Sequence, residues 1–237
     1  MNYKFNMNIA EDAFNKGIKK VTIGFSTGKD SLVGIDLLKK AGIEFIPIYF
    51  YIVPDLQFIE NTIKRYEVLF DMKVVRLPHP VLYDYINHQD WQPLDRTMTI
   101  GQFNLGKITF RLLTNMYLQS KKIKGFDYDC NCMKMADSLN RRLLLRNKPD
   151  IDSKTKTIYL TKYFSTGQCF AYLKENNIPL SDDYRIFGRS FDGLSYHFLM
   201  GVKKYYPEDY ERIKEYWPLI DAEIMRYEIV KKQKFES

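Results

Sequence analysis

The stretch Val21-Thr22-Ile23-Gly24-Phe25-Ser26-Thr27-Gly28-Lys29-Asp30-Ser31 decides the fold of this chain of 237 residues. Its apolar first half predicts a buried strand over Val21–Phe25, and a helix is expected to open at Asp30-Ser31 after a tight turn. Backbone N–H groups at the start of a helix have no partners within the helix, so such a turn is a ready site for an anion. The expected ligand is a phosphate, a pyrophosphate or a sulfate.

The side chains of this turn add hydroxyl groups and a positive charge. The groups in question belong to Ser26, Thr27, Lys29 and Ser31. The turn is not the mononucleotide P-loop, because Gly24 and Gly28 are separated by only three residues, and it is not a GxGxxG loop. The alternative interpretation is an ordinary corner between strand and helix, capped by Asp30 or Ser31 and without function.

The order of elements around the turn predicts an α/β fold with a doubly wound, mostly parallel sheet. Strands are expected over 20–25, 44–51 and 73–77, and helices that end near 40 and 71 separate them. A β-α-β-α-β order with short connections is typical of parallel strands joined by right-handed crossovers. Open parallel sheets bind ligands at the carboxyl ends of their strands, which is where the turn after Phe25 lies.

The rest of the chain is expected to be mostly helical. Helices are predicted over 9–19, 107–122, 133–146 and 165–175, a strand over 158–160, and an irregular excursion over 81–106. Pro47 is awkward for a central strand and argues for a place near an edge or a strand start. Two units are expected, a nucleotide-binding domain over 1–200 and a helical C-terminal extension over 201–237.

Composition limits the classes of protein that this chain can belong to. No apolar run reaches the roughly 20 residues that span a bilayer, and the N-terminus shows no signal pattern, so a cytoplasmic protein without a membrane partner is expected. The three cysteines predict thiols and no disulfide framework. A formal charge of +7 suggests an anionic partner.

The turn resembles the PP-loop of the adenine nucleotide alpha hydrolase superfamily, which includes ATP pyrophosphatases, tRNA thiolation enzymes and phosphoadenosine phosphosulfate (PAPS) reductases. The usual family pattern is Ser-Gly-Gly-Lys-Asp-Ser, and this chain has Ser26-Thr27-Gly28-Lys29-Asp30-Ser31. Thr27 replaces the first glycine of the loop. If that position needs a positive φ, a β-branched residue there is strained.

Three later segments are similar to PAPS reductases, so the resemblance covers roughly residues 17–200. They are Cys130–Leu139, Phe164–Pro179 and Tyr184–Ser190. The resemblance implies an enzyme that binds ATP or PAPS. With ATP and Mg²⁺, it would transfer AMP to an acceptor oxygen and release pyrophosphate.

The resemblance also implies roles for individual residues. Ser26, Thr27, Gly28, Lys29 and Ser31 would cradle the leaving phosphates, and Asp30 would cap the helix or help to place the metal, with Lys29 and Asp30 as the catalytic pair. The ends of the first two strands would flank the adenine, with Phe25 and Tyr51 among the contacts. Lys134 and Arg189 would neutralise the remaining phosphate or sulfate charge.

The cysteines depart from the family pattern. An iron–sulfur cluster needs a full set of thiolates, and only Cys130, Cys132 and Cys169 are present, so neither a cluster nor another metal is expected at them. The C-terminal tail has no cysteine to act as the nucleophile of a PAPS reductase. Two alternatives therefore stay open beside adenylyl transfer: sulfonucleotide reduction, and a module that binds a nucleotide or a nucleic acid without turnover.

Basic residues gather in two places. One group is Arg141, Arg142, Arg146 and Lys148, and the other is Lys121, Lys122 and Lys124. They either track the phosphates of a nucleic-acid substrate or form a solvated helix face. The sequence leaves open whether the acceptor is a nucleic-acid base or a small metabolite, and it leaves the oligomeric state open.

Overall fold

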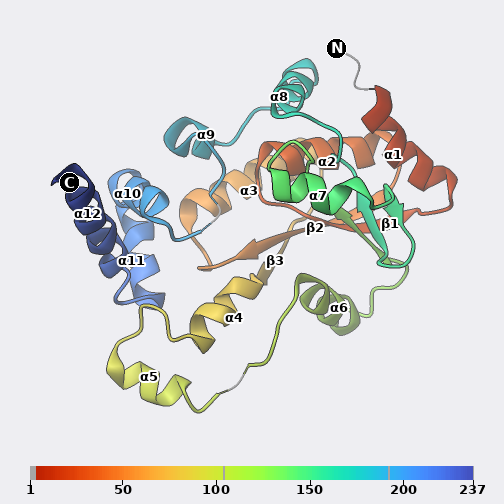
Figure 1. Ribbon diagram of the computed structural model, residues 1–237. Coiled ribbons are helices and arrows are strands. Elements are labelled where there is room, and N and C mark those ends of the chain that lie inside the picture. Colours follow the sequence, from red (N-terminus) through yellow and green to blue (C-terminus); the bar gives the residue numbers. More distant parts are fainter. Residues whose placement is uncertain (1–3, 104, 192, 237) are drawn as a thin grey trace.

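A computed structural model describes residues 4–103, 105–191 and 193–236; the remaining six positions lie outside the described residues. Within the described residues the chain forms one six-stranded sheet with the strand order β3-β2-β1-β4-β6-β5 (Figure 1). The strands are β1 (Lys20–Gly24), β2 (Glu44–Tyr51), β3 (Val75–Pro78), β4 (Tyr128–Asn131), β5 (Ile151–Asp152) and β6 (Thr157–Tyr159). All neighbours pair in parallel except β5, which runs antiparallel to β6.

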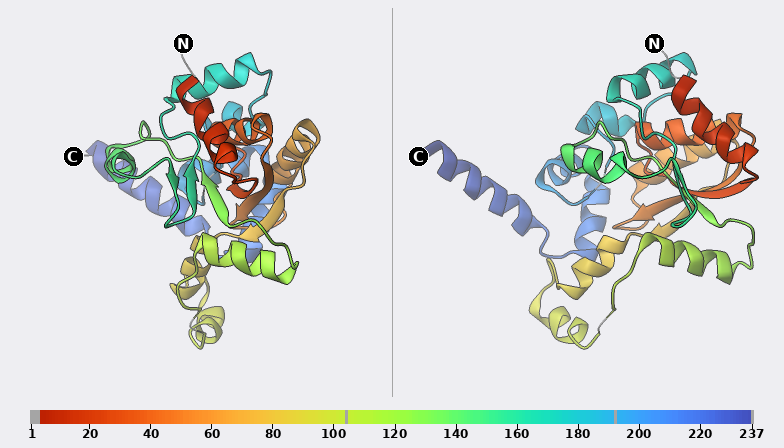
Figure 2. Two further views of the ribbon diagram at one scale, coloured as in Figure 1. Left: turned by 90° about the vertical axis from the view of Figure 1, so that its right-hand side faces the viewer. Right: turned by 45° about the vertical axis from the view of Figure 1, so that its right-hand side comes forward.

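Helices lie on both faces of the sheet, as the predicted doubly wound α/β fold requires. The first face is covered by α1 (Lys4–Asn15), α2 (Lys29–Lys40) and α3 (Gln57–Phe70), and α8 (Thr166–Glu175) packs on α2. α6 (Phe110–Ser120) lies on the opposite face, where Phe110 contacts Phe50 of β2 with ring centroids 4.8 Å apart (Figure 2). The fold class predicted from the sequence is confirmed.

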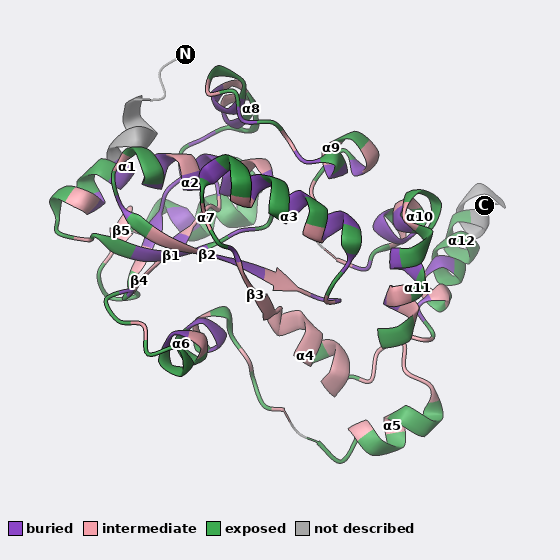
Figure 3. Ribbon diagram, turned by 180° about the vertical axis from the view of Figure 1, so that it is seen from behind, coloured by how far each residue is buried: buried purple, intermediate pink, exposed green. Residues whose placement is uncertain are grey.

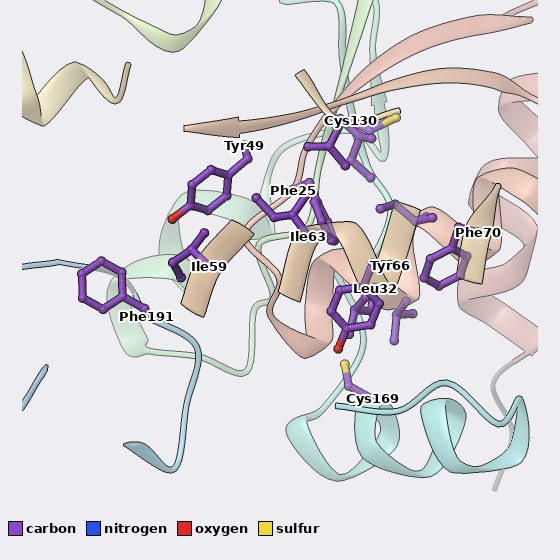
Figure 4. Packing of buried hydrophobic residues seen from close by; sticks show 14 of the residues in the cluster. Phe25, Leu32, Tyr49, Ile59, Ile63, Tyr66, Phe70, Cys130, Cys169 and Phe191 are labelled. Atoms are coloured by element: carbon purple, nitrogen blue, oxygen red, sulfur yellow. The ribbon is translucent and has the colours of Figure 1, made fainter. Parts of the chain in front are cut away.

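The core between β1, α2 and α3 is built from residues at helical spacing. Leu32, Ile35 and Leu38 of α2 are fully buried, and each contributes about 2 kcal/mol by leaving water. The Phe25 ring meets Tyr66 of α3 edge-on, with ring centroids 5.9 Å apart (Figure 4). Cys169 of α8 closes the other side of this cluster. The turn after β1 is therefore held by packed elements.

Further helices surround this body. They are α4 (Pro80–Asn87), α5 (Leu94–Ile100), α7 (Leu139–Arg146), α9 (Asp182–Phe187), α10 (Tyr196–Tyr205), α11 (Pro207–Tyr216) and α12 (Asp221–Glu236). α5 is largely exposed at one end of the molecule (Figure 3), and α12 extends away from the sheet (Figure 2).

Several element predictions were wrong in their extent. The expected irregular region over 81–106 contains α4 and α5, because Pro80 stands at the first turn of α4 and the His79 ring caps it by accepting the Val81 N–H. α7 begins at Leu139 and not at residue 133, because Ser138 caps it. The two-residue strand β5 and the helices α9 and α10 were not predicted.

Pro47 lies in the interior of β2, between β1 and β3. Successive residues of a strand point their backbone groups to alternate sides, and the Ile48 carbonyl accepts the Phe25 N–H on the β1 side. The missing N–H of Pro47 therefore faces β3. There the pairing begins only at Ile48 with Val75, so no ladder hydrogen bond is lost.

Position 200, the expected boundary between two units, lies inside α10. The hydrophobic cluster runs without a break from Ile9 of α1 to Ile224 of α12. The division at 200 stays a proposal. In the described part of the chain, no helix combines the length and the apolar character needed to cross a membrane.

We predict that Gly34→Ala destabilises the protein by about 1–3 kcal/mol, because overpacking a filled core forces side chains or backbone to shift. A Cβ at this position of α2 would lie 2.5 Å from the Cys132 Sγ and 3.1 Å from the Ile23 Cδ1. Urea denaturation measures the change. In a Cys132→Ala background the added methyl group should cost less, and strictly additive effects would contradict the contact.

Candidate functional site

The start of α2 leaves backbone donors open. Gly28 is the N-cap residue, and it has no side chain that could cap the helix. The Lys29 N–H donates to the Tyr184 hydroxyl at 3.1 Å. The N–H groups of Asp30 and Ser31 have no acceptor within the described part of the chain. The macrodipole adds partial positive charge at this end, so an anion is stabilised here.

Thr27 adopts a backbone conformation with positive φ, which the sequence analysis considered for this position. Its φ is +58°, in the left-handed region, and its side chain is fully buried. A β-branched residue there costs about 1–3 kcal/mol, and the hydroxyl offsets part of the cost by donating to the Ser26 carbonyl at 2.6 Å. Gly28 has ordinary extended angles, but a Cβ there would meet the Ser190 Oγ at 2.8 Å. A glycine is needed at this position because the Ser190 side chain approaches its Cα closely.

The hydroxyls and the ammonium of the loop converge at the start of α2. Ser26 Oγ lies 3.5 Å from Ser31 Oγ, and Ser31 Oγ also donates to the Gly28 carbonyl at 2.9 Å. Lys29 Nζ lies 3.3 Å from Asp30 Oδ2. Oxygen and nitrogen donors of this kind suit a phosphate group.

A cavity of about 1100 Å³ opens beside the loop, at the carboxyl ends of β1, β2 and β4. This volume lies slightly above the roughly 300–1,000 Å³ that small-molecule sites span. The cavity continues over the sheet face that carries Thr22 and Asp129, toward Arg111 of α6. An aromatic wall stands opposite, formed by Phe50, His79 and Phe110.

A buried ion-pair network lies under the loop. The Lys134 ammonium, with no exposed surface, contacts Asp30 Oδ2 at 2.5 Å and Asp137 Oδ1 at 2.9 Å. Asp137 also binds Arg141 at 2.6 Å. Burial lowers the pKa of Lys134, but hydrogen bonds to the two carboxylates outweigh it and raise the pKa. Lys134 stays charged and ties the start of α2 to the segment after β4.

The expected site residues divide into those that line the cavity and those that do not. Lining it are Phe25, Ser26, Gly28, Lys29, Asp30, Ser31 and Arg189. The Thr27 side chain belongs to the loop but is buried, and Lys134 is buried under the loop. Tyr51 is not part of the lining, in which its neighbours Tyr49 and Phe50 stand. The loop and Arg189, which are far apart in the sequence, therefore line the same cavity. Tyr51 and Lys134 do not line it.

Sequence reasoning gave no role to several lining residues. Tyr184 and Ser190 belong to a segment that was singled out only for Arg189, and both contact the loop. The His79 ring borders the cavity, and burial lowers its pKa. Arg111 and Asp129 pair at 2.7 Å on the sheet face. In β1, polar Thr22 is followed by apolar Ile23. This alternation was the signal in the sequence that one face of the sheet carries polar side chains.

Asp183 anchors the segment that reaches the loop. Its side chain is 1% exposed, Oδ2 accepts the Phe191 N–H at 3.3 Å, and Oδ1 has no hydrogen-bond partner in the described residues. Burial raises the pKa of Asp183 to about 6. Tyr184 and Ser190 lie within the stretch between these two anchoring residues.

The three cysteines are free thiols within or beside the site. Burial raises the pKa of Cys132 to about 12, and it raises the pKa values of Cys130 and Cys169 as well. None is a thiolate at neutral pH, so none is poised as a nucleophile. Among residues 4–103, 105–191 and 193–236, no three His, Cys, Asp or Glu side chains gather as a metal site.

Comparisons with known proteins give a likeness of fold. No protein-family model and no curated protein sequence matches the chain. Yeast FAD synthetase in complex with FAD superposes with a TM-score of 0.51 at 8% identity, over 87% of this chain and 75% of the synthetase. NH3-dependent NAD synthetase from Campylobacter jejuni gives 0.49 at 13% identity, over 95% of both chains. PAPS reductase from Candida auris gives 0.47 at 12% identity, over 79% of this chain and 87% of the reductase.

The chain therefore shares its overall fold with yeast FAD synthetase. The α/β fold predicted from the sequence is confirmed. At these identities a shared fold does not define a reaction, so the chemistry has to be argued from the site.

We predict that Lys134→Met lowers the free energy of unfolding by about 2–3 kcal/mol, because Asp30 and Asp137 lose the buried cation that they share and keep only Lys29 and Arg141 as partners. Urea denaturation measures the loss, and Lys154→Met on an exposed turn is the control. In an Asp30→Asn background the same change should cost less. A loss as small as that of the control would mean that the network does not hold the loop.

The pKa of Asp183 predicts a pH dependence of stability. Because the folded value is raised to about 6, the folded state holds this proton more tightly than the unfolded state. The stabilising contribution is complete near pH 4 and is lost as the pH rises through about 6, an effect of about 2–3 kcal/mol. Asp183→Asn should therefore stabilise the protein more at about pH 8 than at about pH 4. The exposed neighbour variant Asp182→Asn should show no such gain, and an Asp183→Asn effect independent of pH would contradict the buried carboxylate.

Proposed function

We propose that this chain is an enzyme that binds ATP at the Ser26–Ser31 loop and transfers AMP to an acceptor, with release of pyrophosphate. In this reaction the acceptor oxygen attacks the α-phosphorus. The bond to the oxygen that bridges the α- and β-phosphates breaks, and pyrophosphate leaves with the electron pair. The acceptor proton passes to solvent or to a base.

The observation that carries the proposal is the uncapped start of α2, which faces a cavity of nucleotide size. Its open N–H groups, the Lys29 ammonium and the Ser26 hydroxyl are donors held in place before a ligand arrives, and the Ser31 hydroxyl, which donates to the Gly28 carbonyl, braces the loop. Donors aimed at the leaving phosphates stabilise the charge that builds on them in the transition state. The loop is thus proposed to bind the pyrophosphate half of ATP.

The adenosine half is proposed to lie along the ends of β1 and β2. Phe25, Tyr49 and Phe50 border the cavity there. Arg189 lines the same cavity and is proposed to neutralise phosphate charge. Yeast FAD synthetase, which shares the fold, is known in complex with FAD, a molecule that contains an adenylate group.

Asp30 suits the Mg²⁺ that accompanies ATP. Its Oδ2 is held by Lys134, but its Oδ1 is buried and has no hydrogen-bond partner in the described residues. A single carboxylate oxygen together with phosphate oxygens is a common way to hold Mg²⁺. When bound, the ion would neutralise charge on the phosphates, and Lys134 would keep the Asp30 carboxylate ionised and in position.

Sulfonucleotide reduction by a thiol is the less favoured function. It requires a thiolate nucleophile at the substrate. Cys130 and Cys132 border the cavity, but burial keeps both protonated, and Cys132 is packed against Gly34. The observed environment of these thiols therefore favours adenylyl transfer.

The acceptor is proposed to be either a nucleic-acid base or a small metabolite. The cavity exceeds the range of most single-ligand sites and leaves room for a second substrate beside Asn131 and Arg141. Arg142 and Arg146 are exposed on α7 next to this side of the cavity, as a nucleic-acid substrate would need. Three free thiols and an ATP substrate are in keeping with the proposed cytoplasmic location.

The test is release of pyrophosphate from ATP in the presence of Mg²⁺ and candidate acceptors. We predict that Lys29→Ala lowers the rate by at least about tenfold, because a charge-assisted contact to phosphate is worth about 1.5–3 kcal/mol. Lys64→Ala, an exposed lysine of α3, should leave the rate unchanged. Tight binding of ATP without release of pyrophosphate with any acceptor would instead support a binding module, and no binding of ATP or PAPS would reject the proposal.

A further inference from the structure

Tyr184 holds a position that the loop motif alone does not account for. It belongs to α9, 155 residues beyond Lys29 in the sequence, yet its hydroxyl accepts the Lys29 N–H at 3.1 Å. This N–H is the first backbone donor of α2. The Tyr184 side chain also borders the cavity.

The hydrogen-bonding capacity of this hydroxyl is only half used. A phenol oxygen can accept hydrogen bonds and also carries one hydrogen to donate. The oxygen of Tyr184 accepts from Lys29, so its own hydrogen must point elsewhere. No acceptor for that hydrogen is present within the described ranges of the chain. A donor that borders a cavity without an acceptor is what an anionic ligand requires.

The surrounding contacts fix the hydroxyl before any ligand binds. The Tyr184 ring meets Phe170 of α8 edge-on, with ring centroids 6.1 Å apart. α9 ends at Gly188, whose φ is +70°. Beyond it, the buried Asp183 carboxylate holds the Phe191 N–H, and Ser190 lies against Gly28. Because these contacts order the residue in advance, little conformational entropy has to be lost on binding.

We propose that the Tyr184 hydroxyl is a phosphate-binding donor of this site. It accepts the first N–H of α2 and donates its own hydrogen to a phosphate oxygen of the bound nucleotide. The inference rests on the proposed binding of a nucleotide phosphate chain at the loop. It adds a neutral donor to the positive charge of Lys29, so that the phosphate group is bound by the loop on one side and by α9 on the other.

The opposite role would be a plug, in which the hydroxyl occupies the place of the anion and has to leave. The two roles predict opposite changes in the affinity for a phosphate compound when the hydroxyl is removed. Removing a donor weakens the binding of a phosphate compound, whereas removing a plug strengthens it.

Tyr184→Phe tests the inference, because it keeps the ring against Phe170 and removes only the hydroxyl. Calorimetry should measure the binding of two probes, inorganic pyrophosphate and adenosine. We expect the affinity for pyrophosphate to fall about tenfold and that for adenosine to stay unchanged, since a hydrogen bond to a charged group is worth at least about one such factor. Tyr205→Phe, an exposed tyrosine of α10, is the control.

Unchanged or tighter binding of pyrophosphate by Tyr184→Phe overturns the inference, and tighter binding identifies a plug. In that case a loss of pyrophosphate binding in Lys29→Ala shows that the proposed function still stands. If the unaltered protein binds neither pyrophosphate nor ATP, the proposed function fails, and the role of Tyr184 fails with it. Thermal unfolding of each variant, followed by circular dichroism, verifies that the fold is kept.

Discussion

The free backbone N–H groups at the start of α2 are the constraint on which the site depends. A helix that begins without a side-chain cap, at the carboxyl end of a central strand, has donors that must be satisfied from outside the helix. The strand order places β1 between β2 and β4, so the loops after all three strands meet at this point. The remaining groups of the site, from Ser26 to Arg189, are arranged around those donors.

Charge balance keeps the loop in a form that can accept an anion. Lys29, Lys134 and Arg141 face two carboxylates, those of Asp30 and Asp137, so one positive charge is left over. Because Lys134 is buried and shared between both carboxylates, Asp30 is prevented from neutralising Lys29 completely. An ion pair that contributes little to net stability can therefore set the electrostatics of the cavity.

The sequence predicted the parts of the structure that depend on local patterns. The bounds of β2 were predicted as observed, and the start of α2 followed from the turn chemistry around Gly28 and Lys29. The strain expected at Thr27 is present as a positive φ. The α/β class followed from the alternation of apolar strands with helices.

The features that were missed depend on contacts between distant segments. Lys134 lies in a family-like segment, but only the fold shows that two carboxylates hold it beneath the loop. Tyr51 ends β2 and was expected at the adenine, but the cavity is lined by its neighbours Tyr49 and Phe50. The contact between Tyr184 and the Lys29 N–H joins two helices that are far apart in the sequence, and no periodic pattern in the sequence predicts it. The fold could be predicted well, and the loop of the site too, but not the residues that complete the site from α9.

The most direct measurement is a nuclear magnetic resonance titration of the ¹⁵N-labelled protein with an ATP analogue that cannot be hydrolysed. The account predicts that the largest amide shifts occur from Gly28 to Ser31, because the open N–H groups of Asp30 and Ser31 bind the phosphate oxygens and the Lys29 N–H donates to the Tyr184 hydroxyl beside them. Saturable binding with unshifted amides at the start of α2, and with the largest changes elsewhere in the chain, would contradict it.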